Sequence, residues 1–183
     1  MDLYQFQVTY HAQEDRLLLR FSFKDAAADL HEIRAWLTRR MVRQLWPNLR
    51  QALETQVTLD QPGASHAKSD LVSMAYQASV SELTAGGNFN VVFDAQATHF
   101  PLGEQPLLLN TVQLTMARGL PIQANFHPLE GPGFDLKLST TLLHGLCTML
   151  QSAVAKSDWD MNLVLPGADV PADLAGLDVR VLN

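Results

Sequence analysis

Two stretches of equal length decide the fold: IRAWLTRRMVRQLWPNLRQAL at residues 33–53 and FDLKLSTTLLHGLCTMLQSAV at residues 134–154. Each begins with apolar residues at every second position, which indicates a half-buried β-strand, and continues with apolar residues three and four apart, which indicates an amphipathic helix. A hydroxyl residue, Thr38 or Ser139, stands at each junction, where its oxygen can accept a hydrogen bond from a free amide of the first helical turn. Each stretch therefore predicts a strand that leads directly into a capped helix.

The two stretches correspond position by position at a constant offset of 101 residues. This correspondence predicts an internal duplication of a unit with three or four strands and one helix. A buried strand before any capped helix gives a similar pattern without a common origin. The expected pseudo-repeats cover about residues 1–60 and 88–160, and an irregular linker lies at 56–87. The matched pairs are Ile33/Phe134, Ala35/Leu136, Leu37/Leu138, Thr38/Ser139, Met41/Leu142, Val42/Leu143, Leu45/Leu146, Leu49/Leu150, Ala52/Ala153 and Leu53/Val154.

Alternating apolar residues elsewhere extend each unit with further strands. A short helix is also expected within 69–83. Because neither unit alone covers both faces of its strands, we expect the two halves to share one core. The sequence thus predicts one α+β domain over residues 1–183, with a mainly antiparallel sheet and two long helices. The expected strands lie at 4–10, 16–23, 30–37, 89–95, 107–116, 121–127, 134–138, 161–165 and 177–182, and the long helices at 39–55 and 140–156.

This order of elements resembles the double β4α arrangement of PUR-type and Whirly-type single-stranded nucleic-acid binders. The resemblance lies in the topology alone and carries over no residue. It implies single-stranded nucleic-acid binding as an alternative function.

The charge distribution argues against nucleic acid as the main partner. The 183 residues carry a formal net charge of −6, although eight of the thirteen basic residues lie between Arg16 and Arg50. A nucleic-acid-binding domain is usually strongly basic, so only a local patch could serve. The N-terminus has neither a basic region nor a long apolar run, and no membrane span is expected. We therefore expect a cytoplasmic protein.

No spacing typical of a catalytic or metal site is found. The six histidines form neither an H-x-H nor an H-x-x-x-H pattern, and the single cysteine, Cys147, has no CxxC neighbour. We expect no metal and no cofactor, and the sequence favours a protein that is not an enzyme. An enzyme whose site is assembled from scattered residues such as His99, His127 and Asp135 stays open.

Basic residues gather on the first helix. At 100° per residue, Arg39, Arg43 and Arg50 fall within about 40° of one another, and Arg40 lies further round. Guanidinium groups suit carboxylates and phosphates. These four arginines are either a solvated outer face or a surface for a partner.

The second helix carries no charge from residue 140 to residue 155. Opposite its leucine stripe lie the small polar residues Thr141, Gly145, Thr148 and Ser152. A solvated helix face normally carries charges, so we expect another element or chain to cover this face. The neighbour is either the segment at 65–85 or a second copy of the chain.

Together these patterns predict a non-enzymatic protein-interaction or assembly subunit. Its expected partner is another protein or a second copy of itself. The candidate binding residues are Arg39, Arg40, Arg43, Arg50, Thr141, Gly145, Thr148 and Ser152.

Overall fold

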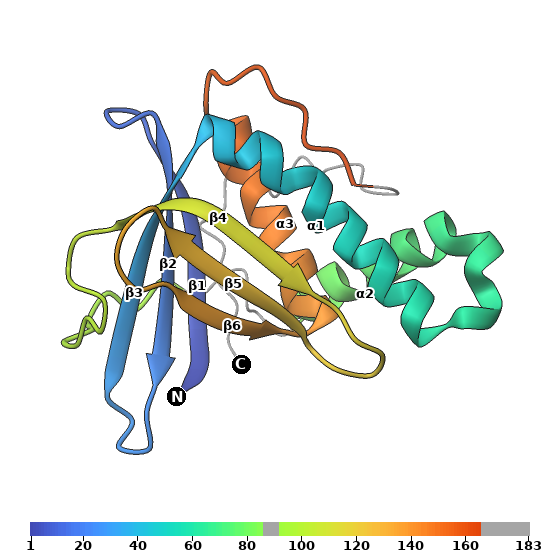
Figure 1. The fold of residues 1–183 in the computed structure, drawn as a ribbon, viewed down its shortest axis with the longest axis horizontal. Coiled ribbons are helices and arrows are strands. Elements are labelled where there is room, and N and C mark those ends of the chain that lie inside the picture. The colour runs from blue at the N-terminus through green and yellow to red at the C-terminus, as the bar shows by residue number, and fades with distance from the viewer. Residues whose placement is uncertain (86–91, 166–183) are drawn as a thin grey trace.

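A six-stranded, mostly antiparallel sheet and three α-helices form the part of the chain that the computed structural model describes, residues 1–85 and 92–165 (Figure 1). This confirms the α+β class and the mainly antiparallel sheet. The elements are β1 (Asp2–His11), β2 (Arg16–Lys24), β3 (Leu30–Thr38), α1 (Arg39–Asp60), a short 3₁₀ helix η1 (Pro62–Ala67), α2 (Lys68–Ala85), β4 (Leu107–Thr115), β5 (Ile122–Pro128), β6 (Phe134–Leu138) and α3 (Thr140–Ala155).

The strands lie in chain order from β1 to β6. Every neighbouring pair is antiparallel except β3 and β4, which are parallel and pair only at Ala35–Leu107 and Trp36–Leu108. Beyond this contact β4 diverges from β3 and continues to pair with β5 (Figure 1). The sheet therefore consists of two antiparallel three-stranded sections, β1–β3 and β4–β6, joined by one short parallel contact.

Both sections contribute to one apolar cluster, together with all three helices. The ring of Phe21 on β2 lies 5.7 Å from that of Phe126 on β5 and 5.6 Å from that of Phe134 on β6. Because these rings come from both sections, the sheet must curve around the core. We call this side of β1–β3 the inner face and the opposite side the outer face.

The two strand-to-helix junctions form as the sequence predicts. Thr38 Oγ1 accepts a hydrogen bond from the amide of Met41, and Ser139 Oγ accepts one from the amide of Leu142, both at 3.2 Å. The matched apolar positions of the two units are all buried. The described residues place three strands before each capped helix, however, so the order departs from a double β4α arrangement. Internal duplication stays a prediction.

The expectation of two long helices is not confirmed, because the short helix expected within 69–83 is part of a third long helix, α2. The helix α2 has 18 residues, between the 22 of α1 and the 16 of α3. It packs against both α1 and α3, with Val72, Tyr76 and Leu83 buried. Contacts on more than one side remove the single apolar stripe by which sequence analysis recognises a helix.

The strand expected at 89–95 is not found in the part of it that is described, residues 92–95. Instead, the segment at 92–106 crosses the outer face of β1–β3. The amide of Asp94 donates to Gln5 Oε1 at 3.1 Å, and the carbonyl of His99 accepts from the amide of Glu32 at 2.8 Å. The strand expected at 161–165 is also absent, and the one at 177–182 lies outside the described residues.

A buried ionic network lies beneath this segment on the outer face. The Glu32 carboxylate is fully buried and accepts from Arg20 Nε at 2.7 Å, Arg20 Nη2 at 3.0 Å and Arg34 Nε at 2.7 Å. Burial raises the pKa of Glu32, but the hydrogen bonds and charges of the two arginines outweigh it and hold the pKa below its ordinary value. The Arg20 guanidinium also lies 4.0 Å from the centre of the Phe93 ring. The segment at 92–106 is thus held on the sheet by hydrogen bonds and by a cation–π contact to an arginine of the ionic network.

Candidate binding surface on helix α1

The four arginines predicted as a patch all lie on α1. Arg40, Arg43 and Arg50 are exposed, and Arg39 is partly buried. No ion pair in the described part of the chain involves any of the four, which we call the arginine surface. The opposite side of α1, including Trp46, is buried in the core. This burial is why the charged side chains gather on the solvent side.

The charge of the arginine surface is not balanced along the helix. No acidic residue occurs from Arg39 to Leu53, and the first turn of α1 carries no acidic residue that would favour the positive end of the helix dipole. Positive charge is therefore concentrated here on a chain whose net charge is negative. Such a patch attracts anionic groups.

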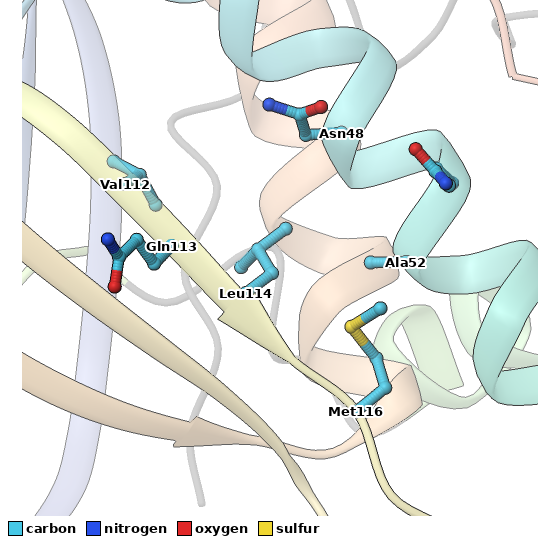
Figure 2. A pocket seen from close by; sticks show the side chains of 7 residues that line it. Asn48, Ala52, Val112, Gln113, Leu114 and Met116 are labelled. Carbon is cyan, nitrogen blue, oxygen red and sulfur yellow. The ribbon is translucent and has the colours of Figure 1, made fainter.

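A pocket of about 380 Å³ lies between α1 and β4, on the same helix as the arginine surface (Figure 2). Three of its lining residues, Asn48, Gln51 and Gln113, have exposed side-chain amides with no hydrogen-bond partner among the described residues. An amide both donates and accepts hydrogen bonds. The pocket can therefore satisfy a ligand that carries donors as well as acceptors. Its remaining lining residues are Ala52, Val112, Leu114 and Met116.

The divergence of β4 from β3 explains why a pocket forms here. The last position of β4 that pairs with β3 is Leu108, and α1 begins directly after β3. The helix, rather than a strand, therefore lies beside the edge of β4 that faces away from β5 (Figures 1 and 2). The sequence did not predict a site at these amides or at this edge, because no local pattern indicates where the pairing of two parallel strands ends.

The second predicted surface, the uncharged face of α3, is covered within the chain. Of the two neighbours that the sequence left open, the segment at 65–85 is the one found, as helix α2. The Tyr76 ring meets the His144 ring edge-on at 5.6 Å, and Thr141 Oγ1 donates to the Glu82 carboxylate at 3.4 Å. The C-terminal half of α3 is covered by residues 161–165, where the carbonyl of Leu163 accepts from Gln151 Nε2.

Because this face is covered within the chain, most of the residues predicted on α3 as a binding surface are not accessible to a partner. Gly145, Thr148 and Ser152 are buried, and only Thr141 keeps a partly exposed side chain. An incoming protein would have to displace α2 or residues 161–165 to reach them. The structure therefore leaves the arginine surface as the accessible one of the two candidates.

The covered face contains a histidine that is buried in its neutral form. His144 is fully buried, and neither ring nitrogen has a hydrogen-bond partner in the described part of the chain. Burial lowers the pKa of His144 from 6.5 to about 4. The imidazole is therefore neutral at pH 7 and contributes no charge to the contact between α2 and α3.

Acidification should therefore weaken the fold through His144. The unfolded chain binds this proton near pH 6.5 and the folded chain only near pH 4, so stability falls as the pH drops between these values. The loss should amount to roughly 2–3 kcal/mol. Urea denaturation at several pH values, compared with His144→Leu, measures it. An equal loss in both proteins would show that His144 does not contribute.

The histidines and acids considered for an enzyme do not assemble into a recognisable site. No hydrogen bond joins any two of His99, His127 and Asp135 in residues 1–85 and 92–165. His99 instead stacks on His31 with ring centres 4.8 Å apart, and His31 Nε2 lies 3.1 Å from a carboxylate oxygen of Asp25. This hydrogen bond is the main reason that the pKa of Asp25 lies below its ordinary value.

The described residues contain no group of three His, Cys, Asp or Glu side chains that could hold a metal ion. None of their helices is both long enough and apolar enough to cross a lipid bilayer. Comparison of the chain with protein-family models, curated proteins and solved structures finds no match.

Proposed function

We propose that this chain is a non-enzymatic protein-interaction subunit whose arginine surface binds an acidic segment of a partner protein. The observation that carries the proposal is the presence of three exposed, unpaired arginines, Arg40, Arg43 and Arg50, on a chain of net negative charge. Arginine forks bind carboxylates in a bidentate manner and lose little water in doing so. Arginine is also enriched among the residues that contribute most to binding at protein interfaces.

A protein partner fits the surroundings of the arginines better than a nucleic acid does. The amides of Asn48, Gln51 and Gln113 offer donors and acceptors, which match peptide groups, whereas a phosphate only accepts. Binders of single-stranded nucleic acid also use aromatic rings as stacking platforms. Trp46 is buried, and the other Phe, Tyr and Trp side chains of the described residues are buried or only partly exposed.

The finer sequence predictions are consistent with this proposal. We propose that the two units arose by internal duplication, which is supported by the matched caps and the matched buried positions. The arginines lie in only one unit, since the corresponding face of α3 is uncharged and covered. In this view one helix keeps a binding role and the other has become part of the core.

Charge reversal on α1 tests the function. The probe is a fluorescein-labelled peptide of alternating Glu and Val, twelve residues long, and the readout is fluorescence anisotropy. The double variant Arg40→Glu and Arg43→Glu should bind at least about tenfold more weakly, a loss of about 1.4 kcal/mol, because attraction becomes repulsion. The control variant Lys137→Glu reverses an exposed charge on β6 and should change the affinity by less than about twofold.

A second probe decides between the partner classes. A single-stranded thymidine 20-mer should bind more weakly than the acidic peptide at physiological salt. If the oligonucleotide binds tightly, with affinity that falls steeply as salt rises, and the peptide does not bind, the nucleic-acid alternative replaces our proposal.

A further inference from the structure

We propose that the acidic segment binds in an extended conformation, as an additional strand on the free edge of β4, in the groove between β4 and α1. This inference rests on the proposed function, since it names the form in which that partner is bound. The binding site would then include main-chain amides and carbonyls of β4 as well as side chains.

The main chain of β4 has an edge without a partner. Its pairing with β3 ends at Leu108, whereas its pairing with β5 continues to Thr115. In the described part of the chain, no hydrogen bond outside the strand ladders involves the main chain of residues 109–115. Unpaired amides and carbonyls on a strand edge are a template for another extended chain.

The groove beside this edge has the length of a short peptide. Its strand wall runs from Val112 on β4 to Met116, the residue after β4, about 13 Å at the usual rise of a strand, which matches the length of four or five residues of an extended peptide. Val112, Leu114 and Met116 are partly buried and apolar, while the α1 wall carries the amides of Asn48 and Gln51 (Figure 2). A peptide there meets apolar side chains on one wall and hydrogen-bonding groups on the other.

The arginine surface lies on the same helix as the groove, although no arginine lines the groove itself. At 100° and 1.5 Å per residue, Arg40 lies about 20° from Gln51 and about 80° from Asn48 around the helix axis, and about 12 Å before Asn48 along it. A bound segment that extends beyond the groove along α1 would therefore bring its carboxylates toward the guanidinium groups on the solvent side. Alternation in an extended chain would place acidic residues toward the arginines and apolar residues toward Val112 and Leu114.

A second copy of this chain fits the groove less well. The β4 sequence, LLLNTVQLT, contains no acidic residue, so an edge-to-edge pair of β4 strands would leave the arginines without partners. Such a pair would also bring two positively charged helices toward each other, which is unfavourable. The charges therefore favour an acidic segment of a different protein.

Main-chain pairing is tested with a matched pair of peptides. The first alternates Glu and Val, and the second has the same sequence with every main-chain nitrogen N-methylated, which keeps every side chain but removes all of the amide donors. We expect the N-methylated peptide to bind at least tenfold more weakly. Hydrogen exchange should show that the amides of residues 110–115 that do not bond to β5 become protected by the unmethylated peptide alone.

A second experiment blocks the groove with a large side chain. Asn48→Trp places a large side chain in the groove and should weaken the binding of the unmethylated peptide at least tenfold, whereas Gln77→Trp, exposed on α2 and outside both the groove and the arginine surface, should leave it within twofold. Equal affinity for both peptides, no change at residues 110–115 and normal binding by Asn48→Trp would overturn this inference while leaving the proposed function intact. The absence of any binding by the acidic peptide would overturn the proposed function itself. A native mass of twice the monomer, with residues 110–115 protected without peptide, would show that a second copy occupies the edge.

Discussion

Replacing Glu32 with alanine should destabilise the protein by about 3 kcal/mol. Glu32 is fully buried and accepts three hydrogen bonds from two guanidinium groups. Its removal leaves the positive charges of Arg20 and Arg34 facing each other in a partly buried site without a counter-charge. Chemical denaturation followed by far-ultraviolet circular dichroism measures the loss.

Glu32→Gln is the matched control for the shape of the side chain. This variant keeps one oxygen acceptor and the packing of the side chain but loses the charge. Its free energy of unfolding should therefore lie between that of the wild type and that of Glu32→Ala. The wild-type contribution should be complete above the ordinary pKa of a glutamate and disappear as the pH falls through the lower pKa of folded Glu32. If both variants unfold at the wild-type midpoint, the network contributes no stability.

Leu45→Ala and Leu146→Ala should each cost about 2–5 kcal/mol. The two leucines occupy corresponding positions of α1 and α3, and their exposed fractions are 4% and 3%. Each substitution removes buried methyl and methylene groups and leaves a cavity that the surrounding side chains fill only in part. Urea denaturation midpoints of the two variants give the comparison.

Arg43→Ala is the control on the opposite side of α1. Its side chain is exposed and has no ion pair in the described part of the chain, so the change in stability should stay within about 0.5 kcal/mol. Comparable losses for Arg43→Ala and Leu45→Ala would contradict the assignment of the buried and exposed sides of α1.

The parts of the fold that could be predicted are those fixed by local patterns. The cap at Thr38 and the stripe that includes Leu45 and Leu49 depend on residues within a few positions of one another, so periodicity and cap chemistry are enough. The cap at Ser139 was predicted for the same reason. The β1–β2 hairpin is also a local contact, with a short polar turn between two alternating strands.

The parts that could not be predicted depend on contacts between distant segments. Phe93 is buried because the segment at 92–106 crosses the sheet, and its alternation with Val92 and Asp94 imitates a strand. A short helix was predicted within 69–83, but the full length of α2 was not, since its buried residues face two other helices and leave no single apolar stripe.

The candidate site, like the fold, could be predicted only in part. Helical phase placed Arg39, Arg43 and Arg50 on one side without any tertiary information. The groove depends on where the pairing of β3 and β4 stops, which is a contact between residues about seventy positions apart. Gln113 carries no signal of its own, because a polar residue on a strand is ordinary.

The segment at 92–106 also constrains the order in which the chain can fold. Its contacts are with Gln5 on β1, Arg20 on β2 and Glu32 on β3, so it has nothing to dock on until those three strands are aligned. Its contacts join residues far apart in sequence, and closing such long loops is slow. The ribosome completes β1, β2, β3 and α1 before residues 92–106 emerge. The N-terminal section can therefore act as the platform on which the rest of the protein assembles during synthesis.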